Sequence, residues 1–399
     1  MKSRLSLFGV ALVLTVASCS NGESQFAQIV AAAAERVTPN VEEAVGLTFR
    51  TPPDIQIRTR EQVTAYLAYK LDVDLSAERV AGIEAAYAMF GLVAEDIDLR
   101  ALLLPLYSEQ VVGFFDPDSN ALYMIDGTDE VQVALILAHE LVHALQAQYT
   151  ALDSILTLDE NDIAVAAQAT MEGQATLAMI PAMIPGQDIN MIPGFWETYR
   201  AQIRAGQEQM PEFMAAPRII QETLIFPYLE GAIFNGWFQR NYPDTVPYGA
   251  RLPVSTEQIL HPAKYREGDT PVRMRFDDSP ELMYQNGLGE FEMRIMLQEL
   301  TGSISVGTTG ALGWDGDQFG VFVDGENKAL VWWTAWDNDG LADRFDEILS
   351  SVWADRQQPG RRFEVLRGTI AGQAAVRLVD AHEGWSGWSD VPPVSVIGN

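Results

Sequence analysis

Hydrophobic residues in the first three quarters of the chain recur mostly at helical spacing. Six runs show this pattern, at 76–90, 98–107, 131–137, 162–178, 218–240 and 289–300. Such stripes are typical of helices packed against a core. Alternating runs at 111–115 and 121–125 instead predict a β-hairpin around the turn at 116–120. This part of the chain is therefore predicted to be mainly helical, with a small sheet.

Two local signals add to this prediction. Thr59 and Gln62 follow a short alternating run at 54–58 and have the spacing of a capping box, which predicts a strand and then a helix. Pro227 interrupts the apolar run at 218–240. Because proline lacks an N–H and clashes with the preceding turn, we expect a kink or a break in that helix.

Beyond Gly313 the pattern changes to strands. Two hairpins are predicted, 319–323 with 329–336 and 363–369 with 373–379, and a helix at 341–354 lies between them. We therefore predict an α+β fold in four segments. These are an export signal at 1–18, a tether and helix at 19–52, a mainly helical core at 53–300, and a β-rich module at 301–399 that forms a separate lobe.

The first residues predict export and a lipid anchor. Lys2 and Arg4 precede a short apolar run at 5–17, which is typical of a secretory signal. The run ends before Cys19, the only cysteine of the chain, in a sequence that resembles a bacterial lipobox. With Ser20 next, this resemblance implies a lipoprotein of the outer membrane that faces the periplasm or the cell surface. The alternative is a plain signal peptide with an incidental cysteine.

The net charge of the chain limits the kinds of partner that it is expected to bind. The chain has 55 acidic and 26 basic residues and a formal net charge of −29. This acidity argues against nucleic acid and anionic headgroups as partners. The sequence also shows no nucleotide-binding glycine motif and no nucleophile elbow.

One motif carries specific chemistry. His139, Glu140 and His143 form H-E-x-x-H inside an apolar, helix-like run. On a helix the two imidazoles project from one face and can bind one Zn²⁺, while the glutamate polarises a metal-bound water. We expect Glu140 to be a general base. A buried helix with two structural histidines remains the alternative.

A catalytic zinc site needs a third protein ligand. The pattern that adds a glycine and a third histidine is excluded, because this chain has Gln146 and Tyr149 there. Glu172 is the best candidate, since a glutamate within an apolar helix is costly to bury unless it is paired or metal-bound. The adjacent Gly173 weakens a helix, which a close backbone approach would explain. The competing acids are Asp153, Asp159, Glu160 and Asp162.

On these residues the chain resembles the gluzincins, of which the thermolysin-like peptidases are familiar members, and more closely a set of uncharacterised bacterial zincin-like proteins. The similar segments include 112–117, 138–146, 172–176, 224–231, 255–262 and 288–291. The resemblance implies a zincin-like core and a metallopeptidase activity. It departs at Thr176, where thermolysin-like enzymes carry an aspartate, so the partners that orient the ligands stay unassigned.

In a conventional gluzincin a His or Tyr stabilises the oxyanion of the intermediate. The resemblance makes His261 the candidate, with Tyr265 as a second; a structural histidine is the alternative. Together these expectations describe a lipid-anchored zinc peptidase that acts on a peptide or protein substrate. The rival functions are a lipoprotein with a structural metal site, and an envelope factor that binds peptides without cutting them.

Overall fold

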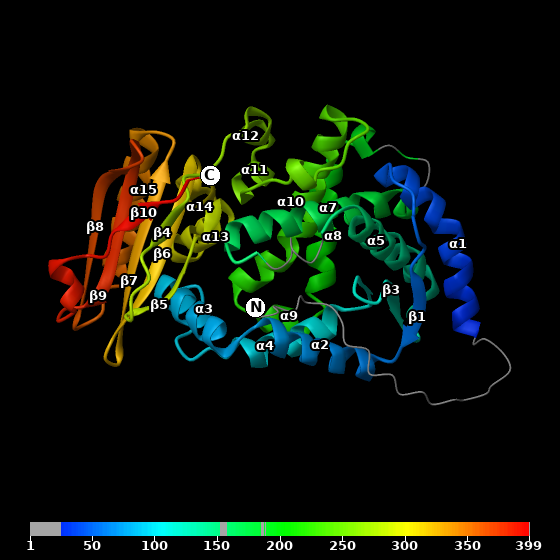
Figure 1. The fold of residues 1–399 in the computed structure, drawn as a ribbon, viewed down its shortest axis with the longest axis horizontal. Coiled ribbons are helices and arrows are strands. Elements are labelled where there is room, and N and C mark those ends of the chain that lie inside the picture. The colour runs from blue at the N-terminus through cyan, green and yellow to red at the C-terminus, as the bar shows by residue number, and fades with distance from the viewer. Residues whose placement is uncertain (1–24, 152–157, 185–186, 188, 399) are drawn as a thin grey trace.

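The computed structural model describes residues 25–151, 158–184, 187 and 189–398, so the predicted export signal and Cys19 lie outside the described residues. It confirms an α+β fold. Helices fill the middle of an elongated molecule, a small sheet lies toward one end, and a five-stranded sheet forms the other (Figure 1). None of the described helices is long and apolar enough to cross a membrane.

The H-E-x-x-H motif lies beside a three-stranded sheet. β1 (Asp54–Arg58) runs parallel to β3 (Ala121–Ile125), and β2 (Gly113–Asp116) pairs antiparallel with β3 as an outer strand. The motif helix α5 (Glu130–Tyr149) packs on β2, and α1 (Gln25–Val45) packs on α5. Their apolar side chains form one buried cluster. The predicted strands and hairpin are confirmed, and the cluster holds them against the motif helix.

Two long helices cross beside α5. α7 (Asn161–Met183) contacts α5 on one side and α10 (Arg218–Asn241) on the other. Glycines make the second contact close: a Cβ atom on Gly173 would lie 2.0 Å from the carbonyl carbon of Gly231. The side-chain amide of Asn235 donates across the crossing to a carbonyl of α7 at 3.0 Å. The close backbone approach predicted at Gly173 is confirmed.

α10 does not break at Pro227, where a kink or break was expected. The residues around the proline are buried in two clusters. Phe226 belongs to the main core, and Leu229 packs with residues of α4 (Leu99–Gln110), α8 (Phe195–Gln207) and α9 (Pro211–Ala215). Packing on both sides offsets the one backbone hydrogen bond that a proline removes from a helix.

The five-stranded sheet is antiparallel, in the order β5-β6-β7-β9-β8. α15 covers one face, where Phe345 contacts Trp332 and Trp336. The predicted hairpins and the helix between them are confirmed. The elements are β5 (Leu282–Asn286), β6 (Trp314–Asp324), β7 (Asn327–Trp336), α15 (Asp339–Asp355), β8 (Arg361–Ile370) and β9 (Gln373–His382).

The expected boundary at residue 301 does not coincide with a break in the structure. β5 precedes that boundary although it belongs to the sheet. One hydrophobic cluster includes Val165 of α7, Phe234 of α10 and Trp332 of β7. The β-rich module therefore shares a core with the helices and is not a separate lobe.

Shorter elements connect these parts. They are α2 (Arg60–Asp74), α3 (Ala77–Phe90), α4 (Leu99–Gln110), α8 (Phe195–Gln207), α9 (Pro211–Ala215), α11 (Thr256–Leu260), α12 (Pro262–Glu267), β4 (Met274–Phe276), α13 (Gly289–Thr301), α14 (Ile304–Ala311) and β10 (Val394–Val396). The capping box at Thr59 is formed and begins α2, as predicted.

The N-terminal end of α7 contacts α11, α13 and β5 through polar and close backbone contacts. Oδ1 of Asp162 accepts a hydrogen bond from the backbone N–H of Thr256 at 3.0 Å. Gly289 fits beside this carboxylate because it has φ +71° and no Cβ; a Cβ atom there would lie 1.9 Å from Asp162 Oδ1. The backbone N–H of Asn161 donates to the Asn286 side chain of β5 at 2.8 Å. The first turn of α7 is thus bound to α11 and to β5, a strand of the five-stranded sheet.

We predict that Gly173→Ala destabilises the protein. Alanine favours a helix over glycine by about 1 kcal/mol, but overpacking costs about 1–3 kcal/mol and occasionally more, and here the added atom meets backbone. The free energy of unfolding, measured in urea, should fall. Gly206→Ala in α8 is the control, because its Cβ would meet nothing within 4 Å, and it should be neutral or stabilising. Equal stability of the two variants would contradict the close crossing.

Candidate metal centre

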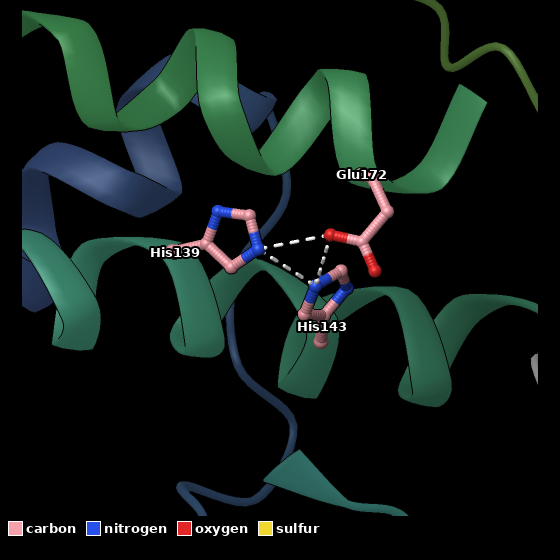
Figure 2. Close-up of side chains that lie close together, drawn as sticks. All are labelled: His139, His143 and Glu172. Atoms are coloured by element: carbon pink, nitrogen blue, oxygen red, sulfur yellow. Dashed lines mark hydrogen bonds and ion pairs between the residues drawn. The ribbon is translucent and has the colours of Figure 1, made fainter. Parts of the chain in front are cut away.

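Three side chains from two helices converge on one point. His139 and His143 project from one face of α5, and Glu172 projects toward them from α7 (Figure 2). Glu172 Oε2 lies 3.0 Å from His139 Nε2 and 3.4 Å from His143 Nε2. The two Nε2 atoms are 3.2 Å apart. The structure therefore brings together the three residues that the sequence predicted as ligands.

These separations suit a small metal ion. A tetrahedral ion with ligand bonds of about 2.0–2.1 Å keeps its ligand atoms about 3.3 Å apart. Two imidazole nitrogens and one carboxylate oxygen are a donor set found in catalytic zinc sites. The three side chains are 13–19% exposed, so the cluster is largely buried but reachable from solvent. The residues fit a metal of this class.

The charges of the cluster favour a cation at its centre. Burial alone would lower the pKa of His143, but Glu172, Glu140 and hydrogen bonds to Glu172 and Gln146 outweigh burial and raise the pKa to about 9. Burial would raise the pKa of Glu172, yet the two imidazoles hold it far below its ordinary value. The carboxylate thus stays ionised beside groups that bind either a proton or a metal.

The competing acids have other partners. Asp159 Oδ1 lies 3.6 Å from an Arg79 nitrogen, and Glu160 pairs with Arg273. Asp162 accepts from Thr256. Asp153 lies outside the described residues. Among the described residues, only His139, His143 and Glu172 form a group of three possible metal ligands.

Glu140 lies next to the cluster but is held by the sheet. Its Oε2 accepts a hydrogen bond from the backbone N–H of Phe115 at 2.9 Å. Phe115 belongs to β2, the outer strand of the small sheet. The outer edge of the predicted hairpin thus lies beside Glu140, and its backbone orients this carboxylate.

Tyr228 is a residue of the site that the sequence interpretation missed. Its ring stacks on His139 with a centroid distance of 5.8 Å. The charge of Glu172, burial, the charge of Glu140 and a hydrogen bond to Glu172 raise the pKa of Tyr228 well above its ordinary value. The hydroxyl therefore stays protonated and can donate. The sequence offered one signal for Tyr228: it lies in segment 224–231, one of the segments that resemble the zincin-like proteins. The resemblance gave no role to this segment.

The structure does not bring His261 to this cluster. Its Nε2 lies 2.9 Å from Glu290 Oε1 and 3.1 Å from an Arg294 nitrogen. Tyr265 donates to the carbonyl of Arg251 at 2.8 Å. The geometry therefore does not support the oxyanion role expected for His261. That expectation came from the family resemblance alone, and the contacts of this histidine are with α13.

Known proteins resemble parts of this chain. Residues 281–387 match a family described as Domain of unknown function (DUF8575), a range that begins at β5 and includes the five-stranded sheet. No curated protein matches. A solved structure, of a proposed hydrolase with a novel fold from Chloroflexus aurantiacus, is 16% identical, with a TM-score of 0.37; the match covers 62% of this chain and 90% of the other. A likeness this weak carries no argument about function.

Proposed function

We propose that the protein is a zinc-dependent peptidase of the cell envelope. One observation supports this proposal above the others: His139 Nε2, His143 Nε2 and Glu172 Oε2 lie 3.0–3.4 Å from one another, with Glu140 adjacent on the same helix. A zinc ion held by these three residues would polarise a peptide carbonyl and lower the pKa of a bound water. The zincin-like classification and the lipid anchor at Cys19 belong to the same proposal.

The residues around the triad have separate tasks in this proposal. Glu140 would accept a proton from the attacking water and deliver it to the leaving amine. Phe115 would keep the Glu140 carboxylate oriented through its N–H. Tyr228 would donate its hydroxyl hydrogen to the oxyanion that forms on the substrate carbonyl. An extended peptide would lie near the outer edge of β2.

A second function is favoured by one contact. The hydrogen bond from Phe115 to Glu140 gives that carboxylate a structural task, which a non-catalytic metal site could also use. The protein would then bind peptides or assist envelope assembly without cutting. The two functions differ in whether Glu140 moves protons.

For the metal ligands, we predict that Glu172→Ala lowers zinc affinity strongly. Its carboxylate is the only acid of the described triad, and losing it leaves two imidazoles. Competition with a chromophoric chelator measures the affinity. Asp159→Ala and Glu160→Ala remove competing acids that pair with arginines, so these variants should bind zinc as the parent does. A large loss in either control, with Glu172→Ala unaffected, would show that the ligand assignment is wrong.

For the base, we predict that Glu140→Gln keeps zinc and stability but loses about 10²–10⁴ in rate, the usual contribution of a general base. Glutamine retains an oxygen that can accept from Phe115 N–H, yet it cannot take a proton. A substrate is first found by digesting a peptide library with the parent, with chelator as the control. If the variant cuts at the parental rate, Glu140 is not the base; if the zinc-loaded parent cuts nothing, the binding function is favoured.

For the hydroxyl, we expect Tyr228→Phe to reduce kcat more than it changes KM. Phenylalanine keeps the ring on His139 and removes only the donor. One oxyanion donor typically contributes about 10²–10³ in kcat. Tyr265→Phe removes a hydroxyl whose partner is Arg251, and it should leave both constants unchanged. A parental kcat for Tyr228→Phe would exclude the oxyanion role.

A further inference from the structure

A buried glutamine connects the two ligand-bearing helices. Gln146 is fully buried on α5, three residues after His143. Its Oε1 lies 2.8 Å from His143 Nδ1. Its Nε2 lies 3.0 Å from the carbonyl oxygen of Met171 and 3.0 Å from Gln174 Oε1, both on α7. Every polar atom of this side chain therefore has a partner.

The partners fix which way the amide points. A backbone carbonyl can only accept, so the atom that faces Met171 is the amide nitrogen. The atom that faces His143 is then the amide oxygen, which can only accept. His143 must donate from Nδ1. A neutral His143 in this arrangement carries its lone pair on Nε2, the atom that lies 3.4 Å from Glu172 Oε2.

The same amide sets the spacing of the helices. Met171 directly precedes Glu172, so one side chain holds both a ligand of α5 and the backbone next to the ligand of α7. Glutamine suits this position because an acid would add negative charge beside Glu172 and Glu140 and would face two acceptor oxygens. No side chain with only donors or only acceptors satisfies all three contacts.

We propose that Gln146 is a positioning residue of the metal centre, which holds His143 with Nε2 ready to bind and aligns α5 with α7. The inference rests on the proposed zinc site and deepens it. Groups that orient metal-binding histidines typically contribute about 10–100-fold to metal affinity. The sequence carried a weak signal, a polar residue one turn from His143 in an otherwise apolar run.

Three variants of the full chain test this role by zinc affinity and by unfolding free energy. Gln146→Met keeps the volume without an acceptor, and its affinity should fall about 10–100-fold. Gln146→Glu keeps an oxygen toward Nδ1 and should recover most of that loss, although the free energy of unfolding falls because a carboxyl group is buried. Gln174→Met is the matched control: it removes the outer partner and leaves the His143 contact, so affinity should stay near parental.

The outcomes separate this inference from the proposed function. If the parent itself binds no zinc, the proposed metal site fails. If the parent binds zinc and Gln146→Met binds it equally well, only the role of Gln146 is overturned. Equal losses in Gln146→Glu and Gln146→Met would also overturn it, because affinity would then follow packing and not the acceptor. Gln146→Leu, which also lacks an acceptor, replaces the methionine variant if that one does not fold.

Discussion

The candidate site depends on how closely α7 and α10 cross. At Gly173 and Gly231 the two backbones touch, since a Cβ atom on the first would lie 2.0 Å from the second. Glu172 is adjacent to one glycine, and Tyr228 is one helical turn before the other. The crossing therefore places an ionised carboxylate and a phenol against each other. It also fixes the distance at which α7 faces the histidines of α5.

The buried charge of Glu172 determines which side chains must surround it. A carboxylate removed from water needs a compensating charge or several hydrogen bonds. Here the compensation comes from two imidazoles of one helix face, which can neutralise Glu172 only while they hold a proton or share a metal. A hydrophobic crossing with the same glycines would be stable without them. The polar triad is therefore a property of the site and not a requirement of the fold.

Features of the fold that depend on residues close together in the chain could be predicted from the sequence. The strand at 54–58, the capping box at Thr59 and both hairpins of the β-rich module follow from periodicity and caps, and the structure confirms them. Glu172 was found from the cost of burying an acid, and Gly173 from its poor fit to a helix. Tyr228 and Gln146 were missed because their roles arise from contacts between helices, which periodicity does not encode. The boundary at residue 301 failed for the same reason: β5 joins the sheet through pairing with a strand about 30 residues later.

The β-rich module also bears on the site through α7. Asn286 of β5 and Thr256 of α11 bind the first turn of this helix, at Asn161 and Asp162. Glu172 follows Asp162 by ten residues, a rise of about 15 Å along a helix. Burial raises the pKa of Asp162 to about 7, so the carboxyl group that holds this end of the helix is protonated in an appreciable fraction of molecules near neutral pH. Close-packed interiors have low compressibility and transmit strain. Contacts between the first turn of α7 and β5, which lies within the range that matches a family of unknown function, therefore bear on the position of Glu172, the proposed metal ligand.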